Sequence, residues 1–267
     1  MRDRRLGRWL LAACLPMGWG CGRAGADLLT TPPTLEAGGA DAPPVCAGFA
    51  AKFNGSAQLR VPRMIQDDFT IEAWIKTASS PSGRWFWDGN GLIYADSCCD
   101  PDPADDFGTS VLNGKFAFGT GNPDTVIESS TDVTTDRWVH VAATRMMMNG
   151  ENRVYVNGAL ESSVTTTEQN SLTTQPTLTL GNTLGGHYYV GLMDEVRLWN
   201  VVRTASEIAV DMHGSSSGNE QGLVAYWRFD DPGGSVALDS SPSHADATII
   251  GPLQWAPLNA PICPAPP

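Results

Sequence analysis

Residues Gly191–Asn200, with the sequence GLMDEVRLWN, carry the clearest structural signal in this chain. Two adjacent carboxylates, Asp194 and Glu195, precede a run that is apolar at alternate positions, and this pattern predicts a β-strand. Neighbouring residues of a strand point to opposite faces, so we expect these two carboxylates to lie on opposite faces of a sheet. That arrangement excludes the facing acid pair of a glycosidase, which needs both groups on one surface about 5–9 Å apart. We expect Asp194 and Glu195 to bind polar groups of loops or strand ends instead.

Short strands are predicted along most of the remaining chain. Phe69–Thr77 (FTIEAWIKT) is apolar on one face, and Trp138–Met146 and Val154–Val156 have the same character. Asn-Gly pairs tolerate the positive φ angles of a type I′ turn, so Asn113-Gly114 and Asn157-Gly158 predict hairpins.

A single stretch, Thr204–His213, has helical character, with Thr204 as the predicted N-cap and Glu207 three residues later. Many short strands separated by turn signals, together with one helix, are typical of an all-β chain. The sequence therefore predicts an antiparallel two-sheet sandwich or jelly roll.

Several segments, taken in order, resemble the laminin-G-like, concanavalin A-like jelly-roll domains of bacterial secreted proteins. The matching segments are FNGSAQLRVP (Phe53–Pro62), FTIEAWIKT, RWVHVAATR (Arg137–Arg145), VYVNGAL, LTLGN (Leu178–Asn182), GLMDEVRLWN with the following TASEIA, and GLVAYWRFDD…ALDSS (Gly222–Ser241). They cover nearly all of residues 46–263. The resemblance implies two packed antiparallel sheets, with ligand sites on loops at one edge or on the concave face.

The N-terminus is predicted to direct export. Residues 1–21 have a basic head followed by an apolar stretch that is too short for a membrane span, as in a secretory signal peptide. Cys14 and Cys21 both end sequences similar to the lipobox of bacterial lipoproteins. We favour lipidation at Cys21. The first alternative is lipidation at Cys14, and the second is a plain signal peptide that is cleaved nearby without lipidation. The expected location is the bacterial cell envelope, with the membrane contacted only through the lipid anchor.

The segments after the signal differ in composition. Residues 22–45 are rich in Pro, Gly and Ala and are expected to form a tether. Residues 46–263 are expected to form one β domain, and residues 264–267 a tail. The net charge is −12, and no basic patch is available to neutralise phosphates, which excludes nucleic acid as a partner.

The cysteines of an exported domain favour disulfides. If Cys21 begins the mature chain, four cysteines remain to pair, namely Cys46, Cys98, Cys99 and Cys263. The sequence leaves all three of their connectivities open.

The densest group of carboxylates lies in Tyr94–Gly108, YADSCCDPDPADDFG. Oxygen-rich loops suit Ca²⁺, although the spacing is not that of an EF-hand. By resemblance to calcium-binding relatives of the fold, Asp105 and Asp106 would bind from this loop and Asn182 from a second one. The hypothesis is one calcium ion held by Asp96, Asp105, Asp106 and Asn182, and the alternative is a solvated acidic loop.

The tryptophans fall into two groups. Four lie inside predicted strands and are expected to pack in the core, namely Trp74, Trp138, Trp199 and Trp227. Trp85 and Trp87 in RWFWDGNG are the better candidates for ligand contact, and they face the same side if the stretch is extended.

The function predicted from these features is that of a non-catalytic binding or adhesion module at the bacterial cell envelope. Its ligand is expected to be a glycan or a protein, with calcium as a candidate cofactor. The E-x-D-x-E pattern of glucanases on this fold does not occur, and GSSSG (Gly214–Gly218) lies in a Ser/Gly run rather than in a nucleophile elbow. A glycoside hydrolase or lyase on the same fold is the first alternative, and a purely structural envelope protein is the second.

Overall fold

The computed structural model describes residues 48–95, 105–121, 123–173, 175–183, 185–214, 216–257 and 260–261. The chain divides into two units, Met1–Ala42 and Pro43–Pro267, and all described residues belong to the second. The predictions for the signal peptide, the tether, Asp96 and the cysteines fall outside the described residues. The described helices include none that is long and apolar enough to cross a membrane.

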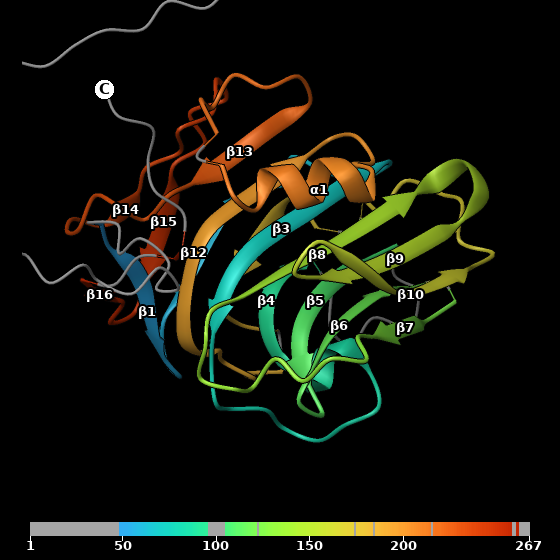
Figure 1. The fold of residues 1–267 in the computed structure, drawn as a ribbon, viewed down its shortest axis with the longest axis horizontal. Coiled ribbons are helices and arrows are strands. Elements are labelled where there is room, and N and C mark those ends of the chain that lie inside the picture. The colour runs from blue at the N-terminus through green and yellow to red at the C-terminus, as the bar shows by residue number, and fades with distance from the viewer. Residues whose placement is uncertain are drawn as a thin grey trace, which may run out of the picture. The chain divides into compact units, whose positions relative to one another are not determined.

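Two antiparallel sheets form the domain (Figure 1). The first sheet contains, in spatial order, β10 (Ala159–Thr165), β9 (Glu151–Val156), β8 (Val139–Met146), β3 (Phe69–Lys76), β12 (Val190–Trp199), β1 (Ala50–Asn54) and β16 (Gln254–Ala256), with β13 (Leu223–Trp227) also paired to β12. The second sheet contains β14 (Val236–Ala237), β15 (Ala247–Ile250), β2 (Gln58–Pro62), β11 (Thr177–Leu180), β4 (Asn90–Ala95), β5 (Phe107–Leu112), β6 (Lys115–Thr120) and β7 (Thr125–Glu128). The predicted fold class, an antiparallel jelly-roll sandwich with one short helix, is confirmed.

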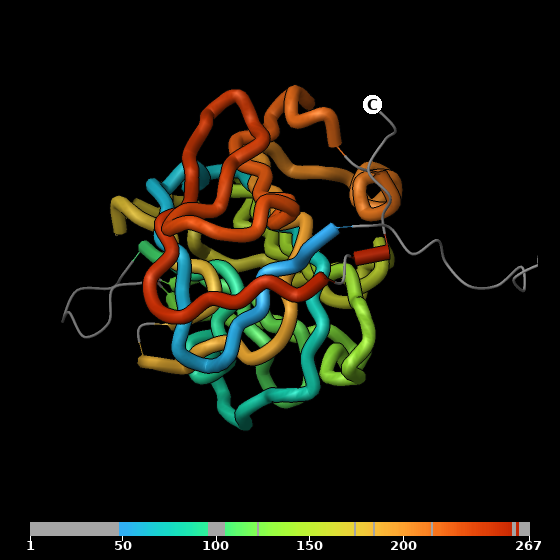
Figure 2. The backbone as a smooth tube through the Cα atoms, turned by 90° about the vertical axis from the view of Figure 1, so that its left-hand side faces the viewer, coloured from blue at the N-terminus to red at the C-terminus, as the bar shows by residue number. Residues whose placement is uncertain are grey.

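The core lies between the two sheets. Alternate residues of most strands enter it, and the rings of Phe69 from the first sheet and Phe107 from the second lie 4.8 Å apart. Figure 2 shows β1 and β16, the first and last strands, running side by side, and their register pairs Ala51 with Trp255. The two ends of the described chain therefore meet in one sheet.

Local sequence signals account for the connections. Asn113 and Gly114 between β5 and β6 both have positive φ, as do Asn157 and Gly158 between β9 and β10, which confirms the two predicted hairpins. The helix α1 (Ala205–Asp211) begins after Thr204, whose side chain accepts a hydrogen bond from the N–H of Glu207 in the predicted capping box.

The helix lies on the outer face of the first sheet, where it passes in front of β3 and β8 (Figure 1). Ile208 of α1 is fully buried against Ala142 of β8 and Tyr155 of β9. Trp227 occupies the core between the sheets, as predicted, whereas Trp74 and Trp199 are buried on the outer face of the first sheet. Trp138 is only half-buried and packs against the Trp74 cluster.

A β-bulge in β12 changes where its acidic residues point. The pairing with β3 places one extra residue between Asp194 and Arg197, and Glu195 takes a left-handed φ of 50°. Met193 and Val196, which flank the acidic pair, both lie in the core between the sheets. Asp194 and Glu195 therefore share the outer face, and the prediction of opposite faces is wrong because strand alternation stops at the bulge.

Candidate ligand-binding sites

The tryptophans predicted to contact ligand lie on a tight turn rather than on an extended segment. The 3₁₀ turn η1 (Phe86–Asp88) places the rings of Trp85 and Trp87 5.2 Å apart with an interplanar angle of 17°. Both side chains are half-buried, and the exposed Arg84 places its guanidinium 4.7 Å from the centre of the Trp85 ring. The two indoles thus form a stacked pair at the surface.

A buried phenylalanine anchors this stack on the second sheet. Phe86 is 0% exposed, and its ring fills the space above Gly108 of β5 and Gly119 of β6. A Cβ atom on Gly119 would lie 2.1 Å from the Phe86 ring, so only glycine admits the ring at this position. The strand neighbours Phe107 and Phe118 point into the core, and the anchored turn therefore covers the outer face of the second sheet.

Hydrogen bonds fix the backbone of the same turn. The carboxylate of Asp88 accepts from the N–H groups of Arg84 and Trp85, each at 2.9 Å. His187, from the loop before β12, places Nδ1 2.6 Å from the carbonyl oxygen of Asp88. The Phe86 ring and the loop that contains His187 therefore both hold the turn that carries the indole stack.

Of the residues predicted to bind calcium, the structure places Asn182 away from Asp106. Asp106 precedes Phe107, which pairs with Ala95 at the end of β4, whereas Asn182 lies against Gly91 near the start of β4. Four residues along a strand separate these positions by about 13 Å. The amide of Asn182 donates to the Gln58 side chain at 2.8 Å.

Asp105 interacts electrostatically with the buried guanidinium of Arg145. Arg145 is 1% exposed and donates to the carbonyl oxygens of Gln66, Asp67 and Asn170. Burial lowers the pKa of Arg145, and the nearby carboxylates, Asp105 among them, oppose that shift. Within the described ranges, no group of three His, Cys, Asp or Glu residues is arranged to hold a metal. A calcium site that includes Asp96 stays a prediction.

Asp194 and Glu195 serve the fold. Asp194 accepts hydrogen bonds from the N–H of Glu195 at 3.0 Å and from that of Ala260 at 2.8 Å, which ties a distant segment to β12. Glu195 pairs with Arg197 at 2.7 Å and accepts from the hydroxyl of Tyr226. Burial raises the pKa of both carboxyls, while the charge of Arg197 acts in the opposite direction on Glu195. The expectation that these carboxylates bind loop or strand-end groups is confirmed for Asp194, whereas Glu195 binds side chains within β12 and β13.

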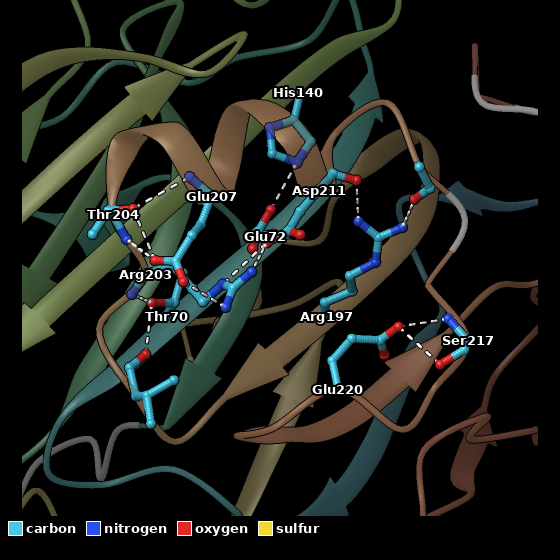
Figure 3. A network of polar contacts seen from close by, with 12 residues as sticks. Thr70, Glu72, His140, Arg197, Arg203, Thr204, Glu207, Asp211, Ser217 and Glu220 are labelled. Atoms are coloured by element: carbon cyan, nitrogen blue, oxygen red, sulfur yellow. Dashed lines mark hydrogen bonds and ion pairs between the residues drawn. The ribbon is translucent and has the colours of Figure 1, made fainter.

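A network of buried and half-buried polar groups fastens α1 and the loop after it to the first sheet (Figure 3). Arg197 donates to the carbonyl oxygen of Asp211 at 2.6 Å, and Arg203 pairs with the Asp211 carboxylate at 2.7 Å. Beneath the helix, His140 and Glu72 point toward one another, with Nε2 and Oε2 3.3 Å apart (Figure 3). These contacts give Arg197, Arg203 and Asp211 partners within the fold.

The outer face of the first sheet also contains a pocket. It has a volume of about 590 Å³ and is lined mainly by apolar surface, together with Lys52 of β1, Lys76 of β3 and Leu192 of β12. Sequence reasoning did not find this site. Lysines at outward positions of predicted strands were the available signal, but their meeting depends on which strands become neighbours.

Comparisons with known proteins agree with the observed architecture. A family model described as the Concanavalin A-like lectin/glucanases superfamily matches residues 52–209. No curated protein matches the sequence. Among solved structures, a candidate carbohydrate binding protein from Bacteroides ovatus ATCC 8483 is 21% identical, with a TM-score of 0.63 over 82% of this chain and 62% of that chain. This chain thus spans less than two thirds of that protein.

Two further structures are more distant. Domain 4 of an extracellular arabinanase from Geobacillus stearothermophilus, in complex with arabinotriose, is 20% identical, with a TM-score of 0.46 over 61% of this chain and 75% of that one. Domains LG4-5 of the mouse laminin alpha1 chain are 16% identical, with a TM-score of 0.46 over 62% of this chain and 45% of that one. The family match covers more than half of the sequence, and the protein therefore belongs to the laminin G-type group of the concanavalin A-like lectin/glucanase superfamily.

Proposed function

We propose that this protein is an exported, lipid-anchored binding module of the bacterial cell envelope that recognises a carbohydrate through the Trp85–Trp87 stack. The observation that carries the proposal is a rigid aromatic pair at the surface. Its rings are held 5.2 Å apart on an anchored turn, so they lose little conformational freedom when a ligand binds. Aromatic faces and edges suit the apolar C–H surfaces of a sugar ring, and the adjacent Arg84 supplies hydrogen-bond donors.

The likeness to the Bacteroides ovatus protein supports this choice of ligand class. That protein is described as a candidate for carbohydrate binding, and its fold is the one described above. Glycan recognition also agrees with the placement of Trp85 and Trp87 on a connection between strands, where a rigid sandwich commonly presents its binding residues.

A glycoside hydrolase or lyase is the less favoured function. Glycoside hydrolysis commonly needs two carboxylates that flank an open cleft. Among the described residues that line the pocket, Asp136 is the single carboxylate, and Asp194 and Glu195 are buried with hydrogen-bond partners. These observations favour a binding role.

Glycan binding to the full chain tests the proposal. A glycan array identifies ligands, and calorimetry then compares the wild type with Trp85→Ala and Trp87→Ala. We expect each variant to bind about tenfold or more weakly, since one stacking contact is lost. Trp255→Ala is the matched control, because Trp255 is also half-buried but lies on β16. Unchanged affinity in both stack variants would refute the proposed site, and a negative array would favour the structural envelope role.

Calcium and anchoring form separate parts of the proposal. If glycan binding needs calcium, a chelator abolishes it and Asp106→Asn weakens it. Equal glycan affinity with and without chelator would show that binding does not need calcium. If the chain is lipidated at Cys21, radiolabelled palmitate is incorporated by the wild type and by Cys14→Ser but not by Cys21→Ser. If labelling is lost only in Cys14→Ser, the lipid is attached to Cys14 instead.

A further inference from the structure

We propose that the pocket on the outer face of the first sheet is a second ligand site, which binds an acidic saccharide and places its carboxylates beside Lys52 and Lys76. This site lies on the opposite sheet from the Trp85–Trp87 stack and shares no residue with it. It goes beyond the function proposed above, because it needs neither tryptophan.

The two lysines lie in one row across three adjacent strands. Lys52 of β1 pairs in register with Leu192 of β12, and Leu192 pairs with Lys76 of β3. Phe53 and Ile75, the strand neighbours of the two lysines, are in the core, so Lys52, Leu192 and Lys76 all face outward. With strands about 4.8 Å apart, the Cα atoms of the two lysines lie about 10 Å from one another. Leu192 forms an apolar floor between two ammonium groups.

The positive charge of this pocket is unusual for the chain. The net charge is −12 and the whole sequence contains three lysines, of which two line this pocket. No ion pair to Lys52 or Lys76 occurs among the described residues, whereas the ammonium of Lys115 donates to the carbonyl oxygen of Ser130 at 2.7 Å. Two free ammonium groups beside apolar surface attract an anion more strongly than the same groups in open water.

The wall of the pocket is held in place without a ligand. Thr77 donates its hydroxyl to the carbonyl oxygen of Val190 at 2.6 Å, and the Tyr189 hydroxyl donates to that of Leu192 at 3.0 Å. A Cβ atom on Gly191 would lie 2.4 Å from the carbonyl oxygen of Lys76, so glycine allows β12 and β3 to approach here. The site is therefore preformed, which reduces the entropy lost on binding.

One carboxylate lies at the rim. Asp136 is exposed, has a left-handed φ of 54° and donates its N–H to the carbonyl oxygen of Thr77 at 2.9 Å. The ionisable side chains lining the pocket therefore carry two positive charges and one negative charge. An anionic ligand should bind more tightly once the charge of Asp136 is removed.

The shape and chemistry of the pocket favour a charged sugar. Its volume of about 590 Å³ lies within the range of small-molecule sites, about 300–1,000 Å³. An apolar floor between two cations matches a pyranose ring that has carboxylates on its rim. A neutral sugar would leave both ammonium groups without a partner, and a small inorganic anion would leave the floor uncovered.

Trigalacturonate is the probe for this proposal, and its fully methyl-esterified form is the matched neutral ligand. Titration calorimetry on the full chain should show saturable binding of the acid that weakens with added salt, and no binding of the ester. Lys52→Gln and Lys76→Gln should each weaken binding by about tenfold or more. Lys115→Gln, which makes the same change of charge elsewhere, should have no effect. Asp136→Asn should strengthen binding, since asparagine tolerates the same φ.

Lysine acetylation gives a readout that does not depend on the variants. With three lysines in the chain, mass spectrometry should find Lys52 and Lys76 protected by trigalacturonate while Lys115 reacts at its normal rate. The proposal is overturned if the acid does not bind at millimolar concentration, if the ester binds as tightly, or if both pocket variants bind as the wild type does. Acid binding that is lost in Trp85→Ala and retained in the lysine variants would overturn the second site while supporting the first.

Discussion

Replacing Phe86 by alanine should release the Trp85–Trp87 stack from the second sheet. Phe86 is 0% exposed, and the two positions beneath its ring, Gly108 and Gly119, have no side chains that could fill the space left behind. Truncation of a buried phenylalanine to alanine costs about 3–5 kcal/mol. At about 2–4 °C per kcal/mol for a domain of this size, Phe86→Ala should lower the melting temperature by roughly 6–20 °C.

Circular dichroism measures both consequences on one sample. Thermal unfolding gives the change in melting temperature, and the exciton couplet of two stacked indoles reports the geometry of Trp85 and Trp87 below the transition. Phe116→Ala is the matched control, because Phe116 is equally buried but lies in the core between the sheets. We expect both variants to be destabilised and only Phe86→Ala to lose the couplet. A folded Phe86→Ala variant that keeps the couplet and the wild-type melting temperature would refute the anchoring role.

Three further changes test the buried network and the helix. Arg197→Met should lower the free energy of unfolding by about 3–5 kcal/mol, because Glu195 loses its buried partner, and adding Glu195→Gln should restore part of it in urea unfolding. An equal loss in the single and double variants would contradict this pairing. Thr204→Ala removes the N-cap of α1 and should lower the free energy of unfolding by about 1 kcal/mol in the same assay. An unchanged urea midpoint would show that the cap does not stabilise the domain. Burial acts to raise the pKa of Glu220, but polar contacts, among them hydrogen bonds from the N–H and the hydroxyl of Ser217, lower it from 4.5 to about 2. Its carboxylate therefore stabilises the folded domain above pH 4.5 and loses this effect as the pH falls through about 2. Glu220→Gln should therefore reduce the difference in melting temperature between neutral pH and about pH 2, and an unchanged difference would count against the assignment.

The features that sequence reasoning predicted correctly are set by local interactions. Alternating apolar residues predicted the strand that begins at Phe69, and Asn157-Gly158 predicted a hairpin because few other residue pairs accept two positive φ angles. Thr204 and Glu207 predicted the helix start, since a capping box is completed within four residues. Each of these signals lies within one segment of the chain.

The features that it missed depend on contacts between distant segments. The separation of Asn182 from Asp106 follows from the register of β11, β4 and β5, which no single loop sequence contains. The stack of Trp85 and Trp87 arises from a 3₁₀ turn, and that turn is favoured by the space above Gly119 of a later strand. The lysine pocket likewise exists only because β1, β12 and β3 are neighbours in the first sheet.

The bulge at Glu195 decides where β12 can change its length. Before the bulge, even-numbered residues such as Leu192 face outward, and after it odd-numbered residues such as Arg197 and Trp199 do so. Deleting the extra residue at the bulge would restore regular alternation, so Leu192 and Arg197 would both still face outward. Deleting a residue between the bulge and Trp199, with the bulge retained, would instead turn Trp199 toward the core. A one-residue deletion in β12 should therefore be tolerated best at the bulge itself.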